Sequence, residues 1–170
     1  MPTPIVVPRA KAYLKVRQKS VRDAMKELNL DAIMLTHPPD LAYLTNFTGD
    51  DSIGIITAKD FYIVTDFRYK EQVGIEAGWV KVTIRDGKMG DALAKTFADA
   101  KVRRVGFEAN FTTVGQIDAL QSAIKDQQKT QFLSSCNLRH NNLFCLRKVE
   151  DHDRQSIDTN YWTQLDAKSQ

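Results

Sequence analysis

The stretch WVKVTIRDGKMGDALAKTFADAKVRRVGFE (79–108) decides the fold class. WVKVTIR (79–85) alternates apolar and polar residues, which is typical of a half-buried strand. Leu93 and Phe97 follow at helical spacing, and RRVGFE (103–108) again has the composition of a strand. A strand, a helix and a strand in this order predict an α/β fold, in which crossover helices join parallel strands.

The segments on either side extend this unit. A helix is predicted to begin at Thr112 or Thr113, and QFLSS (131–135) predicts a last strand. IGIITA (53–58) and FYIVTD (61–66) are strand-like runs with a short connection, which indicates an antiparallel hairpin. We therefore expect a mixed sheet.

The N-terminal part of the chain predicts a long helix, a strand and a short helix. Residues 11–28 carry an apolar stripe at a period of 3.6 residues, and AIMLT (32–36) has the length of a strand. Pro39–Leu44 begins with proline, which favours the first turn of a helix. We interpret the other face of the long helix as solvent-exposed rather than as a nucleic-acid or membrane surface. Its basic residues are Lys11, Lys15, Arg17, Lys19, Arg22 and Lys26.

Composition excludes several classes of protein. The chain has 170 residues, 42% of them hydrophobic, and a net charge of +3 from 24 basic and 21 acidic residues. This balance is that of an ordinary globular domain and gives no reason to expect nucleic acid. No apolar run is long enough to cross a bilayer, and MPTPIVVPRA (1–10) does not resemble a secretory signal. With two cysteines only, we expect a cytoplasmic protein with reduced thiols.

The residues offer two candidate metal sites. The first is zinc, because four potential ligands lie close in sequence, but their spacing lacks a Cys-x2-Cys pair, so coincidence is favoured. These residues are Cys136, His140, Cys145 and His152. The second is a magnesium-dependent nuclease site at Asp66 and the Asp50-Asp51 pair. The simpler interpretation is that Asp66 caps the following helix and pairs with Arg68.

The chain contains no G-x-S-x-G, G-x-G-x-x-G or P-loop pattern. One loop nevertheless has an unusual composition for a connecting segment. LAYLTNFTGDDS (41–52) places Tyr43 and Phe47 among polar residues between two strand-like segments. Aromatic side chains in such a loop are consistent with a binding loop, a structural plug or part of a site that is completed elsewhere.

Four segments in order resemble a known family. They are LDAIMLTHPPDLAYLTNFTGD (30–50), TDFRYKEQV (65–73), RRVGFEANFTTVGQIDAL (103–120) and LFCLRKVE (143–150). Together they resemble the N-terminal domain of the creatinase/prolidase/aminopeptidase P family, the pita-bread metallopeptidases. The resemblance implies a three-layer α/β/α domain with a mixed, mostly parallel, ribonuclease-H-like sheet. It assigns residues 1–150 to this domain and 151–170 to a tail or the start of a linker or helix.

The same resemblance implies that catalysis belongs to a different domain of the parent protein. In the family, the pair of divalent metal ions (Mn, Co or Zn) belongs to a C-terminal catalytic domain that this chain lacks, so we expect no cofactor, metal site or activity in the chain alone. The parent would be a hydrolase of the Xaa-Pro dipeptidase or aminopeptidase P type. Its implied partners are its own catalytic domain, a second copy in a homodimer, and short proline-containing peptides.

The resemblance also carries residue roles. Asn46, Phe47, Asp50 and Arg68 match positions near the substrate entrance or the neighbouring subunit, and we expect Phe47 on an exposed rim. Tyr43 and Leu44 match positions that seat the short helix on the sheet. This sequence departs from the family pattern at Asn46, where glycine is usual, and at Asp50-Asp51.

Two alternatives to the resemblance remain open at this point. The chain could be a stand-alone binding or assembly module without a peptidase partner, or a metal-dependent nuclease.

Overall fold

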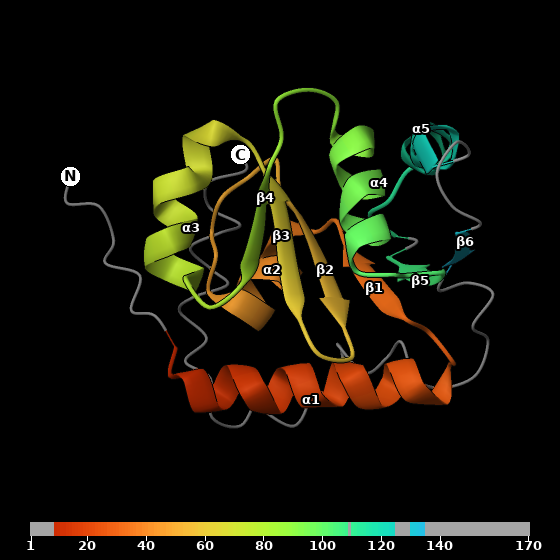
Figure 1. The fold of residues 1–170 in the computed structure, drawn as a ribbon. Helices are drawn as coiled ribbons and strands as arrows, with labels where there is room; N and C mark the ends of the chain where they lie inside the picture. The colour runs from red at the N-terminus through yellow and green to blue at the C-terminus, as the bar shows by residue number, and fades with distance from the viewer. Residues whose placement is uncertain (1–8, 109, 125–129, 135–170) are drawn as a thin grey trace.

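A computed structural model describes residues 9–108, 110–124 and 130–134, and within these ranges six strands form one sheet (Figure 1). The strand order is β4-β3-β2-β1-β5-β6. The strands are β1 (Ala32–Leu35), β2 (Ile53–Thr57), β3 (Phe61–Thr65), β4 (Lys81–Ile84), β5 (Arg104–Phe107) and β6 (Gln131–Ser134). The helices are α1 (Lys11–Glu27), α2 (Pro38–Thr45), the 3-10 turn η1 (Phe67–Tyr69), α3 (Lys70–Ala77), α4 (Met89–Asp99) and α5 (Val114–Ile124).

The sheet is mixed and mostly parallel, as predicted. Strand β2 runs antiparallel to both of its neighbours, β1 and β3. The pairs β1–β5, β3–β4 and β5–β6 are parallel. The carboxyl ends of β1, β3, β4 and β5 therefore lie at one edge of the sheet, together with the amino end of β2.

Each face of the sheet is covered by its own helices, which gives the predicted three layers. Alternate residues of β1 point to opposite faces, so Ile33 and Leu35 pack with α1, α2 and α3. Ala32 and Met34 pack with α4 and α5 on the other face. In Figure 1, α3 and α4 stand on opposite sides of β4, β3 and β2. The hydrophobic core is thus divided between the two faces.

The face of α1 that we expected to be solvent-exposed is partly buried. Arg17 is only 3% exposed, and Gln18 beside it is 5% exposed. Arg17 donates a hydrogen bond from Nη1 to the carbonyl oxygen of Tyr43, and Gln18 donates one from Nε2 to that of Leu44, at 3.1 and 2.8 Å. The prediction was wrong for Arg17, because the last carbonyl groups of α2 lack partners within their own helix.

The edge strand β4 differs from its prediction, and some other predictions fall outside the described residues. Strand β4 is shorter than predicted from residues 79–85, and Val82 on it is 40% exposed, because β4 is an edge strand. The four possible zinc ligands and the 150/151 domain boundary lie outside the described residues. None of the described helices is long and apolar enough to cross a membrane.

Candidate functional site: the 46–52 loop and the carboxyl edge of the sheet

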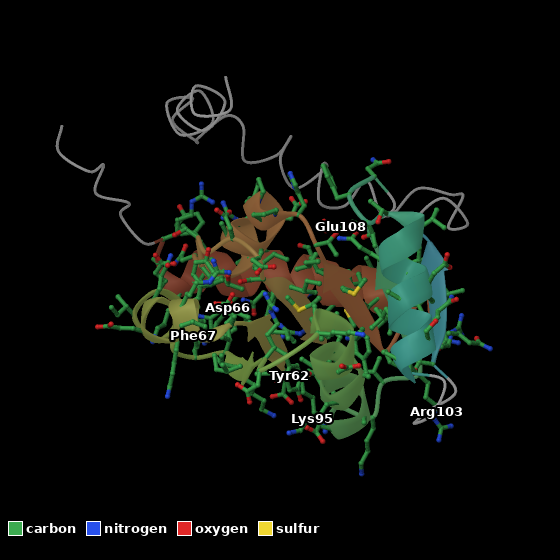
Figure 2. The ribbon with its side chains drawn as sticks, turned by 90° about the horizontal axis from the view of Figure 1, so that it is seen from above. Tyr62, Asp66, Phe67, Lys95, Arg103 and Glu108 are labelled. Carbon is green, nitrogen blue, oxygen red and sulfur yellow. The ribbon has the colours of Figure 1, made fainter. Side chains whose placement is uncertain are left out.

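The polar side chains of interest gather where the parallel strands end. Asp66 follows β3, Arg85 follows β4 and Glu108 follows β5. The 46–52 loop reaches the same edge because it leads into the antiparallel strand β2. Figure 2 shows Asp66 and Glu108 at separate places, so the edge carries two distinct groups of polar side chains. In open α/β sheets, this edge is where ligands commonly bind.

Asn46 ends α2 and fixes the start of the loop. Its φ is 69°, in the left-handed region that glycine or asparagine adopts most readily at the end of a helix. Its side chain accepts a hydrogen bond from the backbone N–H of Arg9 and donates one to the carbonyl oxygen of Arg9, at 3.3 and 3.0 Å. The backbone conformation accounts for the departure from the usual family glycine, because asparagine meets the same requirement and adds two contacts.

Variants of Asn46 separate these two contributions. We expect Asn46→Gly to lower the free energy of unfolding by about 1 kcal/mol, since it keeps the left-handed conformation and loses the contacts with Arg9. Asn46→Ala should lower it by about 2 kcal/mol, because alanine loses the same contacts and also adopts the left-handed region less readily than asparagine or glycine. Urea unfolding followed by circular dichroism measures both. Equal losses for the two variants would contradict the assignment of strain to this position.

Phe47 is not on an exposed rim, and this prediction was wrong. Its side chain is completely buried and meets the ring of Tyr69 edge to face, with ring centroids 6.1 Å apart. A Cβ atom on Gly49 would collide with the rings of Phe47 and Tyr69, so the loop folds its glycine over the phenylalanine. Tyr43 and Leu44 are buried in the same core cluster, which confirms their predicted structural role. Phe47 therefore supports the loop from beneath.

The middle of the loop is held against α3. Glu76 accepts hydrogen bonds from the backbone N–H and the hydroxyl of Thr48, at 2.8 and 3.0 Å. Gln72 donates from Nε2 to the hydroxyl of Thr48 and to Oε1 of Glu76, at 3.0 and 3.1 Å. The contacts of Thr48 are solvent-exposed, yet together they hold its backbone in place.

The end of the loop enters a network of two carboxylates and two guanidinium groups. Asp51, which has a φ of 48°, accepts from Nη2 of both Arg68 and Arg85 through its Oδ2 atom. Asp66 accepts from the Nε of Arg68 at 3.1 and 3.0 Å and from its backbone N–H at 2.9 Å. The predicted capping by Asp66 and its pairing with Arg68 are thus confirmed. Arg85 completes the network with a longer contact to Asp66, 3.5 Å.

The charges of this network stabilise one another. The hydrogen-bonded guanidinium of Arg68 holds the pKa of Asp66 below its usual value, against the opposing effect of desolvation, and Arg85 lowers it further. Asp66 conversely raises the pKa of Arg68. The carboxylate of Asp66 therefore stays ionised at neutral pH, and its charge is already matched by cations of the same domain.

The residues exposed around the loop differ in part from those predicted for the substrate entrance. Asp50 and Thr48 are exposed, as is 57% of the Arg68 side chain. Phe67 lies between Asp66 and Arg68 in sequence and is 75% exposed (Figure 2), which makes it an aromatic side chain that a partner can contact. Sequence reasoning missed Phe67 and Arg85. The position of Phe67 directly after a helix-capping aspartate was the signal that could have indicated an outward-facing side chain.

The described residues do not fit a metal centre. Within residues 9–108, 110–124 and 130–134, no three His, Cys, Asp or Glu side chains are arranged to hold a metal ion. Asp66 directs both carboxylate oxygens at arginine nitrogens. No chemistry of a bound metal is therefore assigned to this part of the chain.

The fold and the loop define a three-layer α/β/α domain with a mixed sheet. A family model for the creatinase/prolidase N-terminal domain matches residues 17–137, and the chain belongs to this family. It is 26% identical over 113 residues to the uncharacterized peptidase YqhT of Bacillus subtilis (strain 168), which covers 66% of this chain.

Solved structures give the same result. An Xaa-Pro dipeptidase from Bacillus anthracis is similar with a TM-score of 0.65 and 28% identity, covering 71% of this chain and 33% of that one. The N-terminal domain of cytoplasmic peptidase PepQ from Mycobacterium tuberculosis H37Rv is similar with a TM-score of 0.64 and 27% identity, covering 70% and 92%. The N-terminal domain of a putative metallopeptidase from Corynebacterium diphtheriae shares the fold, with a TM-score of 0.61 and 22% identity over 73% and 98% of the two chains.

The lengths of these relatives differ from that of the matched region. The match spans 32% of YqhT and 33% of the Bacillus anthracis dipeptidase, about a third of each. It spans nearly all of the two isolated N-terminal domains. The similarity therefore concerns one domain of the longer peptidases.

Proposed function

We propose that this chain is the non-catalytic N-terminal domain of an Xaa-Pro dipeptidase- or aminopeptidase P-like metallopeptidase, in which it supports dimerisation and shapes the substrate entrance. The observation that carries the proposal is the family match over residues 17–137. Peptide hydrolysis would take place in a separate catalytic domain with a pair of Mn, Co or Zn ions. A cytoplasmic location is proposed by similarity to a peptidase described as cytoplasmic.

We assign the proposed entrance to Thr48, Asp50, Phe67 and Arg68, which we call the entrance surface. Exposed aromatic and arginine side chains are enriched at interfaces and often dominate their energetics. Phe67 and Arg68 offer both types side by side, and the Asp51–Asp66–Arg85 network fixes the Arg68 guanidinium. Asn46 and Phe47 act below this surface, as supports of the loop. The homodimer and the short proline-containing peptides belong to this proposal.

The test requires a polypeptide in which a catalytic domain follows this chain, for example a fusion to that of the Bacillus anthracis Xaa-Pro dipeptidase. In it, Phe67→Ala should raise KM for an Xaa-Pro dipeptide, or the dissociation constant of the dimer, by about fivefold or more, since truncating an interface aromatic costs at least about 1 kcal/mol. Tyr13→Ala is the matched control, because Tyr13 is an aromatic residue, 60% exposed, on α1.

Two results would contradict the proposal. One is that Phe67→Ala and Tyr13→Ala change KM and the dissociation constant of the dimer equally, or that neither changes them. The other is metal-dependent hydrolysis of an Xaa-Pro dipeptide by the 170-residue chain alone, since the catalytic metals would then have ligands within this chain.

The alternative functions are distinguished by different observations. A stand-alone assembly module would use the same exposed residues, and the coding sequence after residue 170 discriminates it from a peptidase domain. The nuclease alternative is disfavoured, because both oxygens of Asp66 are bound by Arg68 and Oδ2 also lies near Arg85.

A further inference from the structure

The turn between β4 and α4 contains the one Asp-Gly pair of the sequence, Asp86-Gly87, and the sequence contains no Asn-Gly pair. In Figure 1 this turn is the arch that joins the upper end of β4 to α4. Both residues are exposed and lie in a bend outside the strand and the helix. Among the described residues, no atom lies within 4 Å of the place where a Cβ atom on Gly87 would be. The turn is therefore open to water and is little restrained by packing.

Neither the carboxyl group of Asp86 nor the N–H of Gly87 is held by a contact. Among the described residues, the carboxyl has no hydrogen-bond or ion-pair partner, and the N–H donates no hydrogen bond. The carbonyl oxygen of Gly87 accepts a hydrogen bond from Nη1 of Arg85 at 3.1 Å, in an exposed contact. This contact brings a positive charge close to the Gly87 nitrogen, and a nearby positive charge favours the loss of a proton from that nitrogen.

A second aspartate that precedes a small residue, Asp51, is held in place by contrast. Its Oδ2 atom accepts hydrogen bonds from Nη2 of both Arg68 and Arg85. Ser52, the residue that follows it, is 6% exposed, and its hydroxyl lies 2.7 Å from that of Thr65. The folded structure therefore restrains the Asp51-Ser52 pair and leaves the Asp-Gly pair of the β4–α4 turn free.

We propose that Asp86 is a site of spontaneous isomerisation to isoaspartate. The backbone nitrogen of Gly87 attacks the side-chain carboxyl carbon of Asp86, and the new C–N bond closes a five-membered succinimide ring. One carboxyl oxygen leaves as water, together with the carboxyl proton and the N–H proton. Water then adds to the backbone carbonyl carbon of the ring and breaks its bond to nitrogen, so the chain continues through the side chain. The composition of the protein is unchanged, and no other reactant is needed.

Isomerisation changes the contacts of Arg85. The backbone becomes longer by one carbon atom, about 1.5 Å, between Arg85 and Gly87, so the carbonyl oxygen of Gly87 moves away from Nη1. Arg85 also bonds Asp51 and lies near Asp66, and it therefore joins the β4–α4 turn to the end of the 46–52 loop. We expect the environment of Asp51 to change with isomerisation, and the entrance surface to change with it. Only this last effect rests on the proposed function.

The experiment is a warm incubation of the complete 170-residue chain at neutral pH for several weeks, followed by mass spectrometry of its peptides. Electron-transfer fragmentation identifies isoaspartate, because the Cα–Cβ bond of the residue then lies in the backbone, and the succinimide appears as the loss of one water. We expect isoaspartate to form at least about tenfold faster at Asp86 than at Asp51, a difference of about 1.4 kcal/mol in the barrier. Equal rates at the two residues, or no isoaspartate at Asp86, would overturn the proposal.

A variant and an unfolded control separate the contributions of the glycine and of the fold. Gly87→Ala places its Cβ atom in open space, so the fold should be retained. Isoaspartate formation should slow by about fivefold or more, since a backbone with a Cβ atom reaches the geometry of attack less often. Unfolding in urea releases Asp51 from its arginine partners, so the ratio of the rates at Asp86 and Asp51 should fall. A Gly87→Ala chain that isomerises at the natural rate, or a ratio that unfolding leaves unchanged, would overturn the assignment.

NMR of the incubated chain tests the effect on the loop. New amide resonances of Asp51 and Ser52 should appear in proportion to the isoaspartate content. Asp86→Glu is the matched control, because it keeps the charge while its extra methylene prevents closure of a five-membered ring, so it should show no new resonances. Isoaspartate that leaves the Asp51 and Ser52 amides unchanged would overturn the connection through Arg85. None of these measurements involves catalysis, so the inference stands or falls separately from the peptidase assignment.

Discussion

Replacing Phe47 with alanine is expected to lower the free energy of unfolding of the chain by about 3–5 kcal/mol. The phenyl ring is completely buried and packs with Tyr69 and beneath Gly49, so its removal leaves a cavity under the 46–52 loop. Gly49 cannot collapse into that space without moving Thr48, which is bonded to Glu76. Refilling the cavity therefore requires the loop to leave its position.

Urea unfolding followed by circular dichroism measures this loss, with Phe67→Ala as the control. Phe67 is the same residue type at 75% exposure, so its truncation should change the free energy of unfolding by less than about 0.5 kcal/mol. Phe47→Leu should retain the fold with a loss of about 1–2 kcal/mol, which keeps the comparison measurable if the alanine variant unfolds. Similar losses for Phe47→Ala and Phe67→Ala would contradict the assignment of burial.

Replacing Arg17 with alanine is expected to lower the free energy of unfolding by about 2–4 kcal/mol. The guanidinium group satisfies the carbonyl oxygen of Tyr43 at the end of α2, where a positive charge also interacts favourably with the helix dipole. Its central carbon lies 3.7 Å from the centroid of the Tyr43 ring. The variant loses a charged hydrogen bond and a stacked contact, and it leaves a buried carbonyl without its donor.

The matched control is Lys15→Ala, on the exposed side of the same helix. It should change the free energy of unfolding by less than about 0.5 kcal/mol. Arg17→Lys should give an intermediate loss, because an ammonium group keeps the charge but not the planar stacking. Hydrogen exchange of the amides from Asn46 to Ser52 should accelerate in Arg17→Ala, since the loop begins where α2 ends. A loss for Arg17→Ala no larger than that for Lys15→Ala would show that this contact does not stabilise the fold.

The elements of the fold could be predicted because their signals are local. The apolar stripe of residues 11–28 and the alternation within the strands depend on neighbouring residues, and α1, β1, β2 and β3 appear where these patterns place them. The pairing of β4 with β3 and of β5 with β1 could not be predicted from the sequence, because it joins segments that are distant along the chain. The sequence predicts only that parallel strands are joined by crossover helices. The structure adds which strands are neighbours, in the order β4-β3-β2-β1-β5-β6.

The candidate site was harder to predict, because exposure depends on contacts between distant segments. Phe47 stands among polar residues and was expected outside, whereas it fills the space between α2, α3 and the sheet. Phe67 stands between Asp66 and Arg68 at the start of a segment with the composition of a helix, and it points outward because Asp66 turns the chain into a 3-10 helix. Arg17 looked like one of several exposed basic residues, and nothing in its own helix indicates that the end of α2 lies above it.

Asn46 and Asp51 lie near the two ends of the 46–52 loop, and both adopt positive φ angles without being glycine. Side-chain contacts with Arg9, Arg68 and Arg85 hold them there, so the loop is ordered within the isolated domain. Ordering a free backbone segment costs about 1–2 kcal/mol per residue in conformational entropy. Because folding has already restricted this loop, a partner of the kind proposed above would not bear that cost on meeting it, and more of the contact energy would remain for affinity.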